Sequence, residues 1–594
     1  MNEKFKNLFV DGRKHPFGYL KKHPVILTAL IILALSAVTF CEQNYISESS
    51  IFFAFALLSV ASFGVSLIAA CCGLKRWYSV ILFFFLLISS YLFLYYLRQA
   101  PRKAGYIYIV AIAALAVVFI VLLLTKQLTV ERVIILLFLA GVMLRFTYVL
   151  YTSPSTRQHD VYKFGDSGHS GYIRYLYENG HLPDFDVTEK DQFYHPPLHH
   201  IIAAVWWNIL SAFGVADKYA QSSIQTLTLF YSSVSLIISY KLLKEFKIHG
   251  AALIAVFAVL AFHPTFVIFS ASINNDILSV TFMLLAVLYS VKWYRSRSFK
   301  DIMIIAAAVG LGMMTKLSAY MVAFGIAFLF LFAFIKDIKN FKKYLIQFAA
   351  FAVLCVPLAL WWEIRNAILY DVPIAYVQRL SNTSWQYVGD VPVLTRLFDF
   401  SKLFNAPVFD QWTNRGDKLY NEYNPMISLL KTSVFGEYIN DFGAFSAITA
   451  AAGTLFWSNL IIAFLSVVAL GYTIFSAIRF KAFKNGTVDI GYASIIITGA
   501  LMLIFYYVFC FTYPHHCTEN IRYVSPLIVL GCVFIGRTLC DVKDGLLCGE
   551  PPIPDKEPKR TNKAVTIPLY VATICLITVF CVSSSTMFLQ MAIA

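Results

Sequence analysis

Long apolar runs recur along the whole sequence and decide what this chain can fold into. Each run is about 20 residues long, which as a helix is enough to cross the hydrocarbon core of a lipid bilayer. Hydrophobic residues make up 59% of the 594 residues and charged residues only 14%, whereas about 25% of the residues in a soluble domain are charged. The sequence therefore predicts an all-α polytopic membrane protein. It excludes a soluble enzyme, a secreted disulfide scaffold and a disordered chain.

These runs predict about fifteen transmembrane helices. They are expected at residues 25–41, 51–73, 77–97, 106–125, 132–152, 222–243, 250–268, 274–294, 301–315, 317–336, 342–362, 454–477, 488–511, 522–540 and 565–590. A further apolar run, residues 196–214, is also long enough to cross the membrane. Its crossing would reverse the orientation of every later span.

The distribution of basic residues decides between these two threadings. The chain has a formal net charge of +15, and its Lys and Arg residues gather in short clusters at the ends of apolar runs, such as residues 241–247 and 336–343. Cytoplasmic loops of membrane proteins carry an excess of Lys and Arg. These clusters face the cytoplasm if residues 196–214 stay at the interface. The loop at residues 98–103 is then an exception, because its basic residues lie on the outer side. We therefore expect a protein of the cell membrane with a cytoplasmic N-terminus and no nucleic-acid partner.

The predicted spans divide the chain into three parts. Residues 1–131 form an N-terminal membrane extension of four helices, and residues 132–540 form a membrane core with outer loops at 153–221 and 363–453. Residues 541–594 combine a cytoplasmic linker with the final transmembrane helix.

The first outer loop holds the residues that point most clearly to chemistry. It opens with Arg157-Gln158-His159-Asp160, a few residues beyond the end of a span. A carboxylate held at the membrane surface in this way is well placed to deprotonate an acceptor hydroxyl. Residues 170–180 follow, and their apolar positions form one stripe that ends at a glycine, which predicts a short amphipathic helix along the interface. The loop continues with His195-Pro196-Pro197-Leu198.

This order of features resembles the first outer loop of the GT-C glycosyltransferases, in particular the protein O-mannosyltransferases and the bacterial transferases that attach aminoarabinose to lipid A. The resemblance continues through Ser272-Ile273-Asn274-Asn275-Asp276, Met314-Thr315-Lys316, Trp361-Trp362-Glu363-Ile364-Arg365-Asn366 and Glu519-Asn520-Ile521-Arg522-Tyr523. It covers roughly residues 132–540. It implies a GT-C-like core with interfacial helices in the first outer loop.

The resemblance also implies an activity and a set of site residues. Such enzymes take a sugar from a polyprenyl-phosphate carrier at the extracytoplasmic face and pass it, with inversion, to a glycan, lipid or protein acceptor. The implied catalytic residues are Asp160 as the base, Asp276 and His159. The candidate substrate-binding residues are His195, Lys316, Arg365, Arg522, Tyr523 and Arg145. The cations among them lie at or within predicted spans, where a contact with phosphate is strong because water is sparse.

Two departures from the family pattern limit what carries over. The mannosyltransferases usually show Asp-Glu at the start of this loop, whereas Asp160 is followed by Val161. His195 stands where the lipid A enzymes usually have Lys. The identities of sugar and acceptor therefore stay open. A metal requirement also stays open, because the side chains of Asp160, Asp276, His195 and His199 suit a divalent ion but their spacing is not diagnostic.

A transporter or lipid flippase that handles an anionic lipid-linked substrate is the main alternative. Such a protein needs polar residues along a pathway to the cytoplasmic face, and often shows an inverted repeat. In this sequence the unusual polar residues gather at the outer tips of the spans, which favours the transferase. A catalytically silent scaffold is the third interpretation. Residues 432–438 in the long outer loop are predicted to form part of an acceptor groove.

Overall fold

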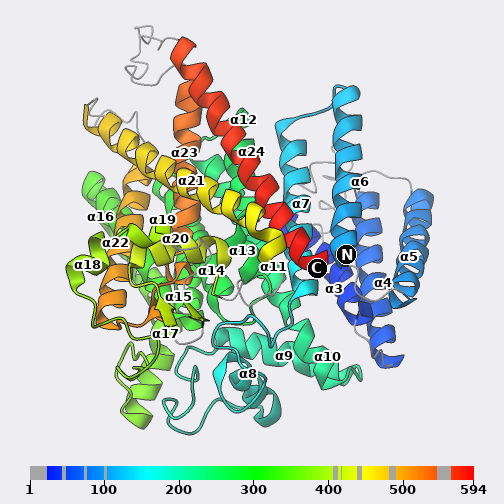
Figure 1. Cartoon of the computed structure of the whole chain (residues 1–594), viewed down its shortest axis with the longest axis horizontal. Helices are drawn as coiled ribbons and strands as arrows, with labels where there is room; N and C mark the ends of the chain where they lie inside the picture. The colour runs from blue at the N-terminus through cyan, green and yellow to red at the C-terminus, as the bar shows by residue number, and fades with distance from the viewer. Residues whose placement is uncertain are drawn as a thin grey trace.

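The computed structural model of the protein describes residues 23–42, 48–71, 76–99, 104–405, 412–415, 418–437, 445–479, 490–544 and 563–593. Within these residues the chain is built mainly of helices, with one hairpin of two short antiparallel strands, β1 (Trp412–Arg415) and β2 (Lys418–Asn421). The long helices run side by side as a bundle (Figure 1). This confirms the prediction of an all-α polytopic membrane fold in its main feature.

Nine helices of the described part are long and apolar enough to cross a membrane. They contain α6 (Ala104–Leu124), α7 (Val130–Tyr151), α11 (Gln225–Glu245), α14 (Asp276–Ser296), α16 (Ala323–Lys336), α17 (Phe341–Tyr370), α21 (Phe445–Arg479), α22 (Ile490–Thr512) and α24 (Lys563–Ile593). Three of these spans begin before the named helix: that of α11 at Asp217, that of α16 at Leu317 and that of α17 at Ile338. A tenth candidate is α23 (Pro526–Lys543) together with the two 3-10 turns before it, which meet α23 at a bend of 49°.

The expected number of about fifteen spans is not confirmed. Two of the predicted spans are short helices in the structure: α12 (Gly250–Phe262) has 13 residues and α15 (Phe299–Thr315) has 17. At a rise of 1.5 Å per residue they measure about 20 and 26 Å, less than a hydrocarbon core of about 30 Å. The N-terminal helices α3 (Pro24–Glu42), α4 (Glu48–Cys71) and α5 (Arg76–Gln99) stay predicted spans.

The ambiguous run at residues 196–214 forms α9 (Leu198–Ala212), a helix of 15 residues. Its length is about 22 Å, too short for a full crossing. Figure 1 shows α9 at the lower edge of the molecule, next to α10 (Asp217–Ser223), which leads into α11. This edge, which also carries α8 (Gly168–Asn179), is called the site end below.

The helix predicted at residues 170–180 is present as α8, and its apolar stripe faces inward. Tyr172, Ile173 and Leu176 are buried, and Gly180 ends the helix with φ +70° in the left-handed region. Tyr177 stacks on Trp207 of α9, with ring centroids 4.2 Å apart. The two short helices therefore form a small aromatic core of their own beside the bundle.

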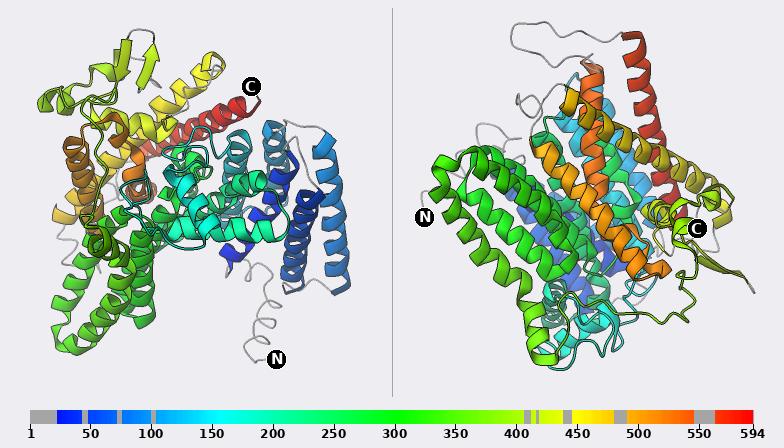
Figure 2. Two further views of the ribbon diagram at one scale, coloured as in Figure 1. Left: turned by 90° about the horizontal axis from the view of Figure 1, so that it is seen from below. Right: turned by 90° about the vertical axis from the view of Figure 1, so that its left-hand side faces the viewer.

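The N-terminal helices α3 to α6 lie along one side of the molecule (Figures 1 and 2). Ser36 of α3 donates a hydrogen bond of 3.0 Å to Thr226 of α11. Tyr108 of α6 donates one of 3.1 Å to Ser585 of α24. These two hydrogen bonds help to hold the extension against the remainder of the bundle. The boundary between residues 131 and 132 stays a prediction.

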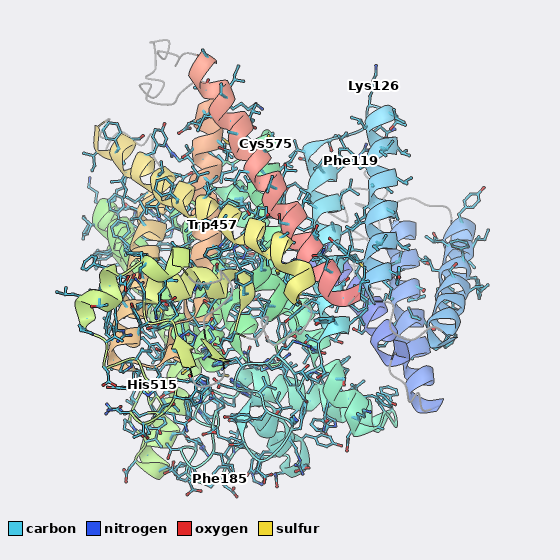
Figure 3. The ribbon with its side chains drawn as sticks, in the orientation of Figure 1. Phe119, Lys126, Phe185, Trp457, His515 and Cys575 are labelled. Atoms are coloured by element: carbon cyan, nitrogen blue, oxygen red, sulfur yellow. The ribbon has the colours of Figure 1, made fainter. Side chains whose placement is uncertain are left out.

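The outer surfaces of the long helices expose large apolar side chains. Val110 and Leu124 of α6 are 68% and 76% exposed, and Val353 and Ile368 of α17 are 76% and 74% exposed. Figure 3 shows further examples, including Phe119 on α6. Soluble proteins do not display apolar surface on this scale. These surfaces therefore suit contact with lipid tails.

Basic clusters lie at the opposite end of the bundle from the site end. Arg295 near the end of α14 forms an ion pair with Glu245 at the end of α11. The start of α12 contacts the end of α23, where the Cys540 sulfur lies 3.8 Å from Nδ1 of His249. Figure 3 likewise places Lys126 and Phe185 at opposite edges of the molecule. The cytoplasmic orientation of these clusters stays a prediction.

Candidate active site

The loop that carries Asp160 has a strained backbone. Four non-glycine residues within it have positive φ: Arg157 (57°), Asp160 (53°), Tyr162 (61°) and Phe164 (53°). Such conformations are uncommon for non-glycine residues and cost on the order of 1–3 kcal/mol each in sparsely populated regions. They persist only where the surroundings hold them in place, and they gather at functional sites.

The first turn of α8 holds this loop. The backbone N–H groups of His169 and Ser170 donate to the carbonyls of Asp160 (2.9 Å) and Val161 (3.2 Å). Gly171 allows the close approach, because a Cβ there would lie 2.7 Å from the Gly165 carbonyl oxygen. The interfacial helix predicted from the sequence thus positions the carboxylate that precedes it.

Asp160 is the first of three side chains joined in a row. Its Oδ2 lies 2.6 Å from Nε2 of His159, and the other ring nitrogen of His159 contacts Oε2 of Glu437. Glu437 follows α20 (Pro425–Phe435), and its Oε1 accepts a hydrogen bond of 2.5 Å from Asn520. Arg522 flanks the row, with one guanidinium nitrogen 3.5 Å from Asp160 Oδ2.

The charges of this row reinforce one another. Burial and the nearby Arg522 lower the pKa of His159, but the carboxylates of Asp160 and Glu437 outweigh them and raise it to about 9. Burial alone would raise the pKa of Asp160, but its contacts with His159 and Arg522 hold it well below the ordinary value. At neutral pH, His159 is therefore an imidazolium and Asp160 a carboxylate.

Asp276 and Lys316 form a second buried ion pair beside the first group. Asp276 is the first residue of α14, and Lys316 directly follows α15. The Nδ2 of Asn275 donates 2.9 Å to the Thr315 carbonyl, so the two helix ends are tied together.

Tyr523 connects this pair with Arg522. Its hydroxyl accepts a hydrogen bond of 2.7 Å from Arg522, and the ammonium of Lys316 lies 5.0 Å from the centroid of its ring. A cation above an aromatic face is attracted by the ring quadrupole. Both cations are thereby held against one aromatic side chain.

A partly open cavity lies between these groups, and its empty space of about 500 Å³ includes open solvent. Its polar lining includes His159, Asp276, Glu437 and Arg522, and its apolar lining includes Phe269. Its remaining lining residues are Tyr148, Arg157, Thr265, Ile268, Ser272, Asn274, Thr432, Phe435, Gly436, Asn520 and Ile521. Four of these residues, Thr432, Phe435, Gly436 and Glu437, belong to the segment 432–438 of the predicted acceptor groove, whose last residue lies outside the described residues. The acceptor groove itself stays a prediction.

Arg522 keeps donor capacity for an anion in this cavity. Its Nε is buried and has no hydrogen-bond partner among the described residues, and its contact with Asp160 is long at 3.5 Å. Unsatisfied buried donors are costly. A ligand oxygen in the cavity would supply the missing acceptor.

His195 lies beside the charged groups but carries no charge itself. Burial and the nearby Lys316 lower its pKa to about 3. Its ring stacks near those of His169 and Tyr194, at centroid distances of 5.4 and 4.5 Å. It therefore cannot replace the positive charge of a lysine at this position.

Two predicted substrate-binding cations are engaged elsewhere in the structure. Arg365 donates a hydrogen bond of 2.5 Å to the Pro183 carbonyl and lies 5.2 Å above the Trp362 ring, so it holds the chain beyond α8. Arg145 donates to the carbonyls of Ala261 (2.6 Å) and Leu260 (3.3 Å) at the end of α12. Neither contacts the charged groups around the cavity, because nearby backbone carbonyls bind their guanidinium groups.

Replacement of Arg145 with Leu is expected to destabilise the protein by about 3 kcal/mol, because charged hydrogen bonds are lost and buried carbonyls lose their donor. Thermal unfolding in detergent measures this effect. Arg132→Gln on the same helix is the control, since Arg132 is only partly buried and its guanidinium bonds to Gln127 near the start of the helix, and it should change stability by about 1 kcal/mol or less. Equal stability of the Arg145 variant and the native protein would contradict a structural role.

The four residues considered for a metal do not form a metal-binding group. His199 Nε2 lies 2.9 Å from the Ile273 carbonyl, and Asp160 faces His159. Within the described part of the chain, no group of three His, Cys, Asp or Glu side chains is arranged to hold a metal ion.

The fold and these groups define a multi-pass membrane protein with a charged, partly enclosed cavity near one end of its helices. Residues 194–362 match the family model described as dolichyl-phosphate-mannose-protein mannosyltransferase. This segment is therefore similar to mannosyltransferase-like membrane glycosyltransferases of the GT-C type, and it spans less than a third of the chain. Asp276 and Lys316 lie inside the matched segment, whereas Asp160 and Arg522 lie outside it. A search of curated proteins found no match.

Proposed function

We propose that the protein transfers one sugar from a polyprenyl-phosphate donor to an acceptor at the extracytoplasmic face of the membrane, with inversion. The observation that carries this proposal is that two ion pairs meet at one cavity: Arg522 and Asp276 line it, and they pair with Asp160 and Lys316 respectively. These residues come from four distant parts of the chain. The basic clusters at the opposite end of the helices support an outward-facing site.

Arg522 and Lys316 form the proposed phosphate site. Arg522 has an unpartnered Nε among the described residues, and Lys316 uses its ammonium for Asp276 while two further N–H donors stay available by its chemistry. Hydrogen bonds between such cations and phosphate are strong, and more so where water is sparse. Asp276 then acts as the group that holds Lys316 in position.

Asp160 is the proposed base. The acceptor oxygen attacks the anomeric carbon of the donor sugar, and the bond from this carbon to the phosphate oxygen breaks. The phosphate leaves with the bonding electrons, and the acceptor proton passes to the Asp160 carboxylate. Attack opposite the phosphate inverts the anomeric configuration. The leaving phosphate is already an anion, so Arg522 and Lys316 stabilise its charge without a general acid.

A two-part assay separates this proposal from the transporter alternative. Purified protein in detergent is incubated with a panel of labelled polyprenyl-phosphate sugars and a membrane extract as the acceptor source. Transfer of label with release of polyprenyl phosphate is the expected result. The same donors are then placed in one leaflet of protein-containing vesicles. Movement of intact donor across the bilayer, without product in either assay, would overturn the proposal.

A further inference from the structure

Glu437 supplies a second carboxylate next to Asp160 from a remote part of the chain. The residue after Asp160 is Val161, whose side chain is fully buried in the small core around α8. Glu437 contacts Nδ1 of His159, and His159 Nε2 lies 2.6 Å from Asp160. The imidazole thus lies between two carboxylates that are 277 positions apart in the sequence.

We infer that Glu437 is a positioning residue of the base: it keeps His159 protonated and bridging, so that Asp160 stays ionised and held between His159 and Arg522. This inference rests on the proposed function. It assigns Glu437 a role that is exerted through His159.

The hydrogen-bonding capacity of imidazole requires this arrangement. A neutral imidazole has one N–H donor and one acceptor nitrogen, whereas the imidazolium has two donors. Both ring nitrogens of His159 face carboxylate oxygens. A neutral ring would therefore place its lone pair against one of these carboxylates, and the protonated ring satisfies both.

The anchoring of Glu437 makes it the fixed end of the row. Its second oxygen accepts the 2.5 Å hydrogen bond from Asn520, and only 4% of its side chain is exposed. Exposure rises along the row, to 13% for His159 and 30% for Asp160. His159 and Glu437 line the cavity, and Asp160 is the most exposed side chain of the row. An acceptor hydroxyl therefore has the freest approach to Asp160.

The charges around His159 determine how its pKa changes when the Glu437 carboxylate is removed. The facing groups are the carboxylates of Asp160 and Glu437 and the guanidinium of Arg522, with the carboxylate of Asp276 further away. Removal of the Glu437 carboxylate leaves the Asp160 carboxylate as the main group that raises the pKa of His159, while burial and Arg522 still lower it. An opposite charge within this distance typically shifts a pKa by about 1–3 units. His159 would then lose its proton at a lower pH.

The pH dependence of kcat/KM tests the inference. In the native protein the pKa of His159 is raised to about 9, so activity that needs the imidazolium is retained at neutral pH and falls as pH rises through this value. In Glu437→Gln this alkaline limb should move down by at least about one pH unit. Glu437→Asp keeps the charge, and it should lower kcat while its alkaline limb stays near the native position.

Glu363→Gln is the matched control, because Glu363 is also a buried carboxylate, near the C-terminal end of α17. It accepts a hydrogen bond of 3.1 Å from the Ala375 N–H and takes no part in the row of Asp160, His159 and Glu437. It should leave the pH profile unchanged. A uniform loss of rate in Glu437→Gln without movement of the alkaline limb would reduce Glu437 to a structural role and overturn the inference. If Asp160→Asn also turned over normally, the proposed function would fail with it. If Asp160→Asn were inactive while the alkaline limb of Glu437→Gln stayed in place, the inference about Glu437 would fail and the proposed function would stand.

Discussion

Replacement of Asp160 with Asn is expected to lower kcat for sugar transfer by about 10²–10⁴-fold, the usual contribution of a positioned general base. Asn has nearly the same shape but accepts no proton at neutral pH. KM for the donor should change little, because the proposed phosphate contacts come from Arg522 and Lys316. Initial rates with a labelled polyprenyl-phosphate sugar measure both constants.

Asp166→Asn is the matched control for this variant. Asp166 belongs to the same loop, and its side chain is 90% exposed. The control should retain native turnover. Native turnover in Asp160→Asn would remove the proposed base and leave the charged row without a catalytic role.

Replacement of Arg522 with Gln is expected to lower kcat by about 10²–10³-fold, as loss of one group that stabilises a developing anion does. Gln removes the charge that faces the leaving phosphate. Arg522→Lys restores the charge without the forked geometry of the guanidinium, so it should recover part of the loss. Inhibition by the product polyprenyl phosphate should weaken in both variants, because the product carries the same anion.

Arg174→Gln on α8 is the control for these arginine variants. Arg174 is 39% exposed and pairs with Glu178 on its own helix at 2.7 Å. Its kinetic constants should match those of the native protein. The phosphate assignment would be wrong if Arg522→Gln kept native kcat and native product inhibition.

Local patterns in the sequence were sufficient to predict α8. Apolar residues at 172, 173 and 176 predict its buried face, and Gly180 its end, because both depend on near neighbours along the chain. Length was less informative for α12, since its apolar run continues past residue 262. His263 and Pro264 end the helix there and start the short α13 (Pro264–Phe269).

The role of each cation depended on tertiary contacts that no spacing reveals. The sequence predicts both Arg145 and Arg522 as cations that bind the substrate. In the structure, Arg145 binds carbonyls at the end of α12, whereas Arg522 lines the cavity. Arg365 likewise follows the family-like Trp-x-x-Arg-Asn pattern and binds the Pro183 carbonyl. The sequence predicted that these arginines lie at or within membrane spans, but it did not predict which groups they contact.

Glu437 was the main functional residue that sequence reasoning missed. It was included in the predicted groove segment only as one member of residues 432–438. Its contact with His159 depends on the fold of the long second loop against the first. The sequence nevertheless offered one signal, a glycine directly before an acidic residue. In the structure this glycine, Gly436, ends α20 with φ +59°. Such a break can aim a side chain at a site.

The most direct test of the account is an experimental structure of the protein with a bound polyprenyl phosphate. The account predicts that the phosphate oxygens lie within hydrogen-bond distance of Arg522 and Lys316, and that the cavity beside Asp160 stays open for the sugar and the acceptor. A phosphate bound elsewhere, with Asp160 outside reach of the anomeric position, would contradict it.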